Sequence, residues 1–205
     1  MIESIFNQYK EATSFQIILE ALVFVFGILS VIFAKKENIL VYPTGLIATV
    51  ITVYLLYQAK YFGDMTLNIY YSVMSIYGWY KWAKGKDDHE LEISRTNFSE
   101  KLIGVLIFFI TMFITYLVYV AFDHPLEKEN YVDIFTSGIF FTAMWYMAIK
   151  KLENWTLWII GDLIAIPLFW YRDLNMLALQ YLIFTILAIL AYIEWKKILD
   201  KQKPE

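Results

Sequence analysis

Seven long apolar stretches run through the 205 residues of this chain, and they constrain its fold more than any other feature. An α-helix needs roughly 20 apolar residues to cross about 30 Å of hydrocarbon. Each stretch is close to that length, and none shows the polar–apolar alternation of an outer-membrane barrel strand. The sequence therefore predicts an all-α membrane protein with seven transmembrane helices. The stretches are residues 15–33, 39–59, 65–82, 102–122, 131–149, 155–171 and 176–195.

Composition supports a membrane location and excludes several other classes of protein. Hydrophobic residues make up 60% of the chain and charged residues only 18%, whereas soluble domains carry roughly 25% charged residues. The formal net charge is −3, so there is no basic field to hold nucleic acid. The chain has no cysteine, which excludes disulfides and thiolate metal sites. Buried helices of a soluble protein are the alternative, but most of these stretches lack the polar face that such helices need.

Basic residues are divided unequally between the two sides of the predicted bundle. With seven crossings, one side holds the N-terminus and every second connection, and it carries four of the seventeen Lys and Arg residues. The other side carries the remaining thirteen. Because cytoplasmic loops are enriched in Lys and Arg, we expect the N-terminus outside and the C-terminus in the cytoplasm. The expected layout includes an extracytoplasmic segment 1–14, a cytoplasmic loop 83–101 and a cytoplasmic tail 196–205.

Two segments in the first half of the chain have similar counterparts in the second half. A shift of 116 residues pairs Glu37 with Glu153, and a shift of 113 pairs IYGWYKWAK (76–84) with ILAYIEWKK (189–197). The matches bracket three helices in each half and leave one helix between them. We therefore predict two parallel three-helix repeats joined by a linker helix, the 3+1+3 plan of SWEET-like transporters. The predicted parts are residues 15–82, 102–122 and 131–195.

One acid lies well inside an apolar stretch, where insertion of a charge costs on the order of 2.5–3.5 kcal/mol. Asp162 has no basic residue in its own stretch, and Trp155 and Trp158 precede it by seven and four residues. All three therefore lie on one helical face. Two indoles and a carboxylate suit a flat cationic ring, because a desolvated cation–π contact contributes about 2 kcal/mol. The structural alternatives are interfacial anchoring for Trp155, packing for Trp158 and a helix–helix hydrogen bond for Asp162.

Further polar and aromatic side chains in other stretches are candidate binding residues. Four follow near-helical spacing in the third stretch, where they contact a solute or only join helices through hydrogen bonds. The first and last stretches add an acid and an amide, for which a packing role is the alternative. This second group is Asn68, Tyr71, Ser75, Trp79, Glu20 and Gln180.

Residues for catalysis or cofactor binding are missing from the apolar stretches. The only histidines, His89 and His124, lie outside them, and the chain has no G-x-x-x-x-G-K-[ST] nucleotide loop. We therefore expect neither an enzyme nor an ATP-driven pump, and no metal ion or other cofactor.

Two segments of the chain resemble the PnuC family of bacterial vitamin transporters. They are residues 42–82 and 150–188, and the most specific marks are IYGWYKW at the end of the third stretch and ENWTLWII at the start of the sixth. The resemblance implies a SWEET-like 3+1+3 bundle in the inner (cytoplasmic) membrane, assembled as a homotrimer. It also implies facilitated diffusion of nicotinamide riboside, made one-way by a cytosolic kinase that phosphorylates the solute.

The resemblance places ligand contacts on the third, sixth and seventh helices, including Trp155, Trp158 and positions 68 and 162. Many family members that carry nicotinamide riboside have Asn in place of Asp162 and Gln in place of Asn68. Relatives that resemble the thiamine branch carry an acid at position 162. Because both solutes contain a cationic aromatic ring, thiamine stays open as the alternative. A SWEET-like sugar carrier is less favoured, since a sugar needs no buried acid, and a sensor or scaffold without transport is the remaining alternative.

Overall fold

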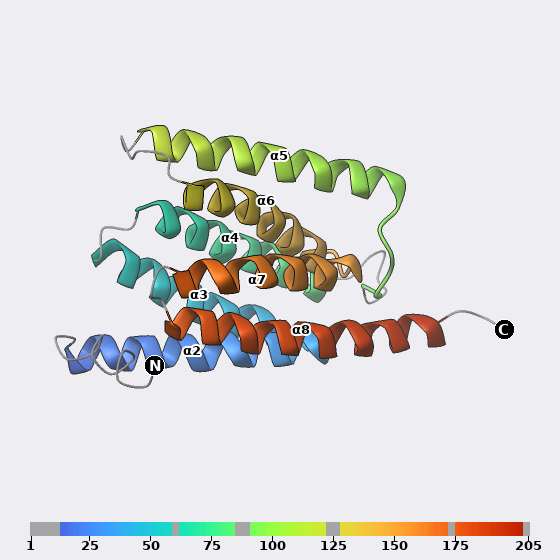
Figure 1. The fold of residues 1–205 in the computed structure, drawn as a ribbon. Coiled ribbons are helices and arrows are strands. Elements are labelled where there is room, and N and C mark those ends of the chain that lie inside the picture. Colours follow the sequence, from blue (N-terminus) through green and yellow to red (C-terminus); the bar gives the residue numbers. More distant parts are fainter. Residues whose placement is uncertain (1–12, 59–61, 85–90, 122–127, 172–174, 203–205) are drawn as a thin grey trace.

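The computed structural model describes residues 13–58, 62–84, 91–121, 128–171 and 175–202, and nearly all of these residues are α-helical (Figure 1). This confirms the predicted all-α fold. Each helix of the described chain covers one of the seven apolar stretches. The helices are α2 (Ser14–Lys35), α3 (Val41–Gln58), α4 (Phe62–Lys84), α5 (Phe98–Ala121), α6 (Lys128–Ala148), α7 (Glu153–Tyr171) and α8 (Asn175–Lys201).

Four of these helices, α2, α3, α5 and α8, are long and apolar enough to cross a bilayer. Within the described ranges, α4, α6 and α7 do not reach the same standard of hydropathy. For α6 the position explains the difference, because this helix is buried over most of its length and has no need of a continuous lipid-facing surface. A crossing by each of the seven helices stays a prediction.

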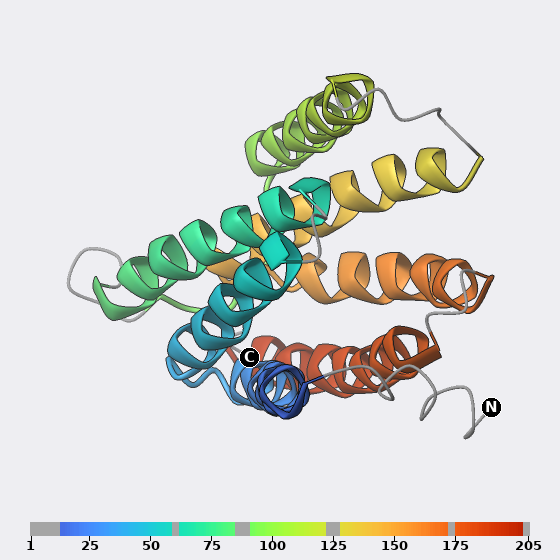
Figure 2. The same ribbon diagram turned by 90° about the vertical axis from the view of Figure 1, so that its left-hand side faces the viewer.

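Six helices of the described chain form a closed ring of neighbouring pairs. In one half of the ring α3 lies between α2 and α4, and in the other α7 lies between α6 and α8. The ring closes where α4 packs against α6 and α8 packs against α2. Figure 2 shows the two sets of three on opposite sides of the bundle. Helix α5 lies outside the ring, mainly against α6.

The turns that follow α2 and α6 have the same backbone geometry. Glu37 and Lys150 both adopt positive φ angles, 53° and 51°. In each turn the next amide, that of Asn38 or Lys151, donates to the carbonyl five residues earlier at 2.9 Å. Both helices therefore end in a Schellman-type turn. The pairing of Glu37 with Glu153 is wrong at this turn, because the residue in the equivalent position is Lys150, at the 113-residue spacing of the second sequence match.

Aromatic side chains from four helices fill one end of the ring. The ring of Tyr42 meets that of Trp82 edge-on, with centroids 5.1 Å apart, and Trp155 meets Trp195 edge-on at 5.4 Å. Trp82 and Trp195 also approach each other, at 6.3 Å. These four residues and their neighbours Ala34 and Met147 are only 0 to 8% exposed. We call the six residues Ala34, Tyr42, Trp82, Met147, Trp155 and Trp195 the end cluster.

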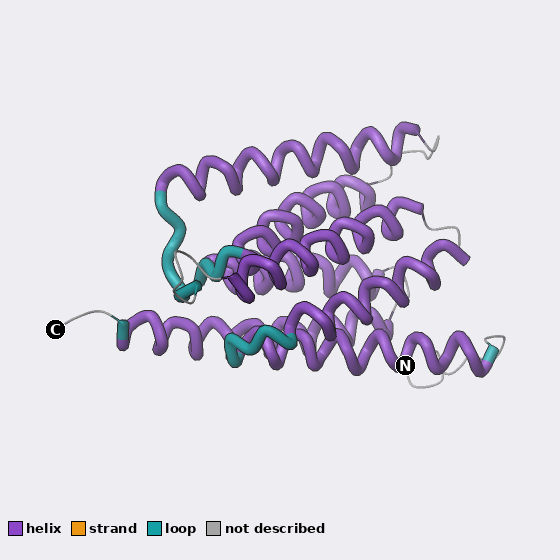
Figure 3. Tube along the Cα trace, turned by 180° about the vertical axis from the view of Figure 1, so that it is seen from behind, coloured by secondary structure: helices purple, strands orange, loops and turns teal. Residues whose placement is uncertain are grey.

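The segment that leads into α5 is fixed against the turn between α6 and α7 (teal before α5 in Figure 3). The amide of Ser94 donates to the carbonyl of Lys150 at 3.1 Å, and the amide of Leu152 donates to the carbonyl of Ser94 at 2.9 Å. The amide of Thr96 donates to the Glu153 carboxylate at 3.0 Å. The described part of the predicted loop 83–101 is therefore a packed part of the end that contains the end cluster.

Candidate functional site

Asp162 lies in the middle of α7 and is only 2% exposed. Among the described residues, no group donates a hydrogen bond to its carboxylate and no cation pairs with it. Burial of an unpaired carboxylate costs several kcal/mol. A protein retains such a group where it binds something, which makes Asp162 the centre of the candidate site.

Trp158 lies one turn before Asp162, and its ring faces two other helices. The ring stacks on Phe140 of α6, with centroids 5.4 Å apart and an interplanar angle of 28°. Tyr71 of α4 lies on another side of the indole, with a centroid distance of 6.4 Å. The indole nitrogen is buried and has no acceptor. Two helices, α6 and α4, therefore supply rings beside an indole of α7 that keeps a free donor.

Gly161 explains how α6 approaches α7 closely enough for this stack. A Cβ at position 161 would lie 2.4 Å from Phe140 Cε1, which is closer than side chains pack. Helix interfaces in membranes use small residues for such approaches. The absence of a side chain at Gly161 thus lets the Phe140 ring occupy the surface beside Asp162.

Helix α8 adds a further ring to this region. Tyr181 lies 6.0 Å from Phe140 and 4.8 Å from Phe169, measured between ring centroids. We call Tyr71, Phe140, Trp158 and Asp162 the candidate site, with Tyr181 behind it. The described residues include no group of His, Asp and Glu side chains that fits a metal ion.

The structure separates the two tryptophans of the predicted slot. Trp155 belongs to the end cluster, where its ring meets Trp195 and its indole nitrogen is buried without an acceptor. Trp158 packs against the edge of the same cluster. The face of α7 that carries Trp155, Trp158 and Asp162 therefore runs from the end cluster into the candidate site.

The other predicted residues are distributed over several interfaces. Tyr71 meets Trp158, as described above. Ser75 is buried towards α3, with its hydroxyl 3.8 Å from the position that a Cβ on Gly45 would take. The amide nitrogen of Gln180 stands at the same distance from the corresponding position on Gly27, at the interface of α2 and α8. Asn68 is half-buried in α4 and accepts a hydrogen bond from Ser72 at its backbone carbonyl, 3.0 Å away.

Two predicted residues are exposed and are not brought to the candidate site. Trp79 is 41% exposed near the end of α4, and Glu20 is exposed on α2. Sequence reasoning missed Phe140 and Tyr181, which lie in stretches without a distinguishing polar pattern. The one available signal was Gly161 beside Asp162, since a glycine within a membrane helix indicates close approach of another helix.

Comparisons with known proteins agree with this fold and show the family. The family model described as "Nicotinamide mononucleotide transporter" matches residues 17–197. The nicotinamide riboside transporter PnuC of Escherichia coli is 25% identical over 195 residues, covering 83% of this chain and 82% of its own. The protein of the same name from Neisseria mucosa is 25% identical over 189 residues, covering 85% and 70%.

A solved structure shows the same fold. The crystal structure of the vitamin B3 transporter PnuC superposes with a TM-score of 0.72 at 22% identity, covering 98% of this chain and 88% of the other. The family model spans most of the chain and its members are transporters rather than enzymes. This chain is therefore a multi-helix membrane protein that belongs to the nicotinamide mononucleotide transporter family.

Proposed function

We propose that this chain takes up nicotinamide riboside across the bacterial inner membrane by facilitated diffusion. The buried, unpaired carboxylate of Asp162, one turn from the indole of Trp158, is the observation that supports a solute with a cationic ring, and the names of the curated relatives select the riboside among such solutes. The nicotinamide ring of the riboside is flat and carries a permanent positive charge. A ring cation gains from an aromatic face and from a nearby carboxylate, so both halves of the site match one ligand group.

The remaining groups of the solute need hydrogen-bond partners. The ribose hydroxyls both donate and accept, and the side-chain amides of Asn68 and Gln180 do the same. Tyr71 and the indole nitrogen of Trp158 add donors near the ring. The other predicted contacts, Ser75, Trp79, Glu20 and Trp155, lie outside the candidate site and are not assigned a contact with the ring cation.

The distribution of cations favours the riboside over the mononucleotide. In the described helices every Lys and Arg lies within the first or last two turns, or in a connection. A phosphate group needs such cations as partners. Asp162 would repel it instead. The proposed solute is therefore the riboside, which lacks the phosphate group. Phosphorylation by a cytosolic kinase is the proposed step that traps it after entry.

Thiamine is the second candidate, and Asp162 is the observation that favours it. The thiazolium ring of thiamine is also a cationic aromatic ring, and an acid at this position fits it equally well. Thiamine has no ribose, but its aminopyrimidine and hydroxyethyl groups also form hydrogen bonds with amides, so Asn68 does not separate the two solutes. The names of the curated relatives support the riboside.

The proposed architecture has seven transmembrane helices in two parallel repeats. Helices α2–α4 form the first and α6–α8 the second, with α5 as the linker. The equal turns at Glu37 and Lys150 and the equivalent interfaces α2–α8 and α4–α6 support this plan. We place residues 1–14 outside, residues 83–101 and 196–205 in the cytoplasm, and expect a homotrimer in the lipid bilayer.

A calorimetric titration of the purified protein tests the proposed solute. Nicotinamide riboside, thiamine, nicotinamide mononucleotide and 1-methylnicotinamide are compared, the last of which keeps the ring cation and lacks the sugar. We expect the riboside to bind most tightly, 1-methylnicotinamide to bind more weakly and the mononucleotide to give no heat. If thiamine binds more tightly than the riboside, thiamine is the solute. Absence of heat with every compound would contradict a site for a cationic ring.

A further inference from the structure

We propose that the end cluster and the Glu37–Lys150 pair are the barrier that opens when solute passes this end of the protein. The proposal rests on the proposed function, because it assigns to these residues a step of transport. They lie outside the candidate site. Together they hold helices α2–α4, the first half of the ring, against helices α6–α8, the second half.

Two reciprocal hydrogen bonds cross from one half to the other. The indole nitrogen of Trp82 in the first half donates to the carbonyl of Met147 in the second, at 3.3 Å. The indole nitrogen of Trp195 in the second half donates to the carbonyl of Ala34 in the first, at 3.0 Å. The two donors are 113 residues apart, and so are the two acceptors. The same bond is therefore made twice, once in each direction.

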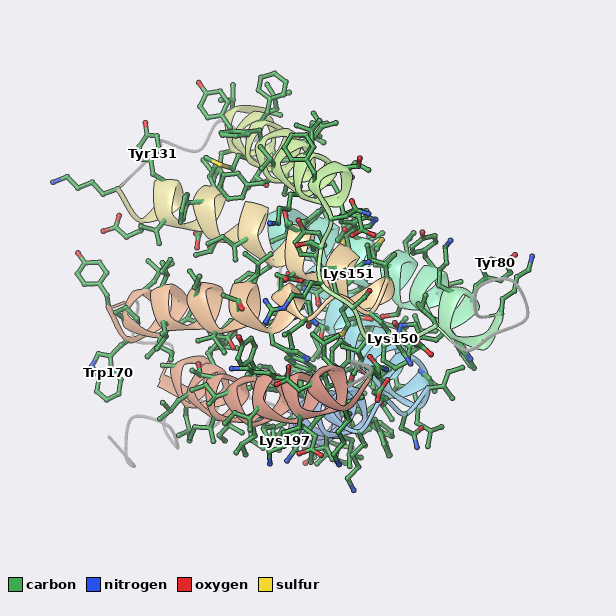
Figure 4. All side chains as sticks on the ribbon, turned by 90° about the vertical axis from the view of Figure 1, so that its right-hand side faces the viewer. Tyr80, Tyr131, Lys150, Lys151, Trp170 and Lys197 are labelled. Carbon is green, nitrogen blue, oxygen red and sulfur yellow. The ribbon has the colours of Figure 1, made fainter. Side chains whose placement is uncertain are left out.

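An ion pair joins the halves beside these bonds. The ammonium of Lys150 lies 3.2 Å from the Glu37 carboxylate, and the two side chains are 9% and 26% exposed. The same ammonium stands 4.5 Å from the ring centroid of Trp82 (Figure 4 looks onto this end and labels Lys150). Glu37 and Lys150 are also 113 residues apart. Equivalent positions of the two halves thus carry opposite charges and bind each other.

The same end contains ion pairs that do not join the halves. Lys151 pairs with Glu100 at 2.7 Å, and Arg95 pairs with Glu153 at 3.8 Å. The first pair connects α5 to the turn between α6 and α7, and the second connects the segment before α5 to the first residue of α7. They can stay intact while the halves separate. The surface that has to part is therefore defined by Glu37–Lys150 and the two tryptophan bonds.

Closure at this end is tight enough to block a solute. The six residues of the end cluster are almost completely buried, and Leu152 beside them is 1% exposed. Passage through the ring requires these side chains to move apart. Because the cross-half bonds at this end are few and adjacent, and the two tryptophan bonds are reciprocal, they break together, which gives the barrier two states, closed and open.

Cross-linking across the ion pair tests the barrier. The natural chain has no cysteine, so Glu37→Cys with Lys150→Cys introduces the only two thiols. A short bis-methanethiosulfonate reagent joins them reversibly, since these side chains are long and a direct disulfide needs closer backbones. We expect cross-linked protein in proteoliposomes to lose uptake of nicotinamide riboside, to keep binding it, and to recover uptake on reduction. Uptake at the uncross-linked rate with the link in place would overturn the barrier.

A matched control uses the ion pair that does not join the halves. Glu100→Cys with Lys151→Cys, treated with the same reagent, should transport equally well before and after cross-linking. Loss of uptake in this control as well would overturn the assignment of the barrier to the Glu37–Lys150 pair and the end cluster. Any cross-link at this end of the protein would then be sufficient to block uptake. Failure of the natural protein to bind or transport the riboside would instead count against the proposed function.

A second measurement needs neither solute nor the ion-pair variants. Trp82→Phe with Trp195→Phe removes both indole donors and keeps aromatic rings in place. In this background Leu152→Cys reports opening by its rate of modification with a thiol reagent. We expect labelling about tenfold faster than for Leu152→Cys alone, since a lost buried hydrogen bond favours the open state. An unchanged labelling rate would overturn the proposal, even if the cross-linking variants do not fold.

Discussion

The ring of Phe140 lies directly against the backbone of Gly161, so that a Cβ there would stand 2.4 Å from Phe140 Cε1. Phe140 in turn stacks on Trp158, and Asp162 is the next residue after Gly161. The close approach of α6 to α7 therefore fixes the orientation of the indole relative to the carboxylate.

Gly161→Ala should weaken riboside binding because the methyl group pushes Phe140 away from Trp158. Overpacking of this kind costs about 1–3 kcal/mol, and if the bound state bears that cost the affinity falls by about 5- to 150-fold. Calorimetry measures the affinity for the riboside, and thermal unfolding measures the stability of the variant. Gly27→Ala is the control, since a Cβ there meets Phe184 at an ordinary 3.5 Å. Equal affinities of the two variants would contradict the role of the Phe140–Gly161 contact.

Asp162→Asn should weaken binding of cationic rings and spare neutral ones. The substitution keeps the shape of the side chain and removes its charge, and hydrogen bonds or contacts to charged groups contribute about 1.5–3 kcal/mol. We expect the riboside and 1-methylnicotinamide to lose affinity by about tenfold or more. Nicotinamide, which is neutral, serves as the control ligand. A similar loss for nicotinamide would mean that Asp162 acts through shape rather than charge.

Trp158→Phe and Trp155→Phe should have different consequences. Trp158 lies in the candidate site, so its replacement should reduce both riboside affinity and the quenching of tryptophan fluorescence by ligand. Trp155 packs on Trp195 in the end cluster, so its replacement should lower the unfolding temperature and leave most of the affinity. A larger affinity loss for Trp155→Phe would show that both indoles contact the solute, as the sequence spacing predicts.

Glu153→Ala should free the segment before α5 from the turn between α6 and α7. The substitution removes the carboxylate that accepts the Thr96 amide at 3.0 Å. Hydrogen–deuterium exchange at Thr96 should then be about tenfold faster, as expected for loss of one charge-assisted bond. Glu92→Ala, at an exposed position of the same segment, is the control. Unchanged protection of Thr96 would mean that the Ser94–Leu152 hydrogen bond alone holds the segment.

The sequence predicts the helices well because apolar length is a local property. Every described helix lies on a stretch identified by hydropathy, and the spacing of Trp158 and Asp162 already places them on one face. The contact between Phe140 and Gly161 depends on how two helices approach, which no periodicity within either helix encodes. The same holds for the division of Trp155 and Trp158 between the end cluster and the candidate site.

The alignment of the two repeats shows a second reason why prediction from the sequence failed at some positions. Matching by residue type pairs Glu37 with Glu153, because both are acids. Backbone geometry instead makes Glu37 equivalent to Lys150, a residue of opposite charge. Glu37 and Lys150 carry opposite charges and bind each other across the two halves. This difference in residue type hides the equivalence of the two positions from a comparison of the sequences.

Uptake of labelled nicotinamide riboside into proteoliposomes tests the central claim most directly. Vesicles with the natural protein, with Asp162→Asn and without protein are compared in the absence of any ion gradient. We predict saturable uptake by the natural protein down the riboside gradient, reduced uptake at low concentration by Asp162→Asn, and none above leakage without protein. Uptake by the natural protein no faster than leakage would contradict transport of the riboside, and equal saturable uptake by Asp162→Asn would contradict a role of the Asp162 charge in that transport.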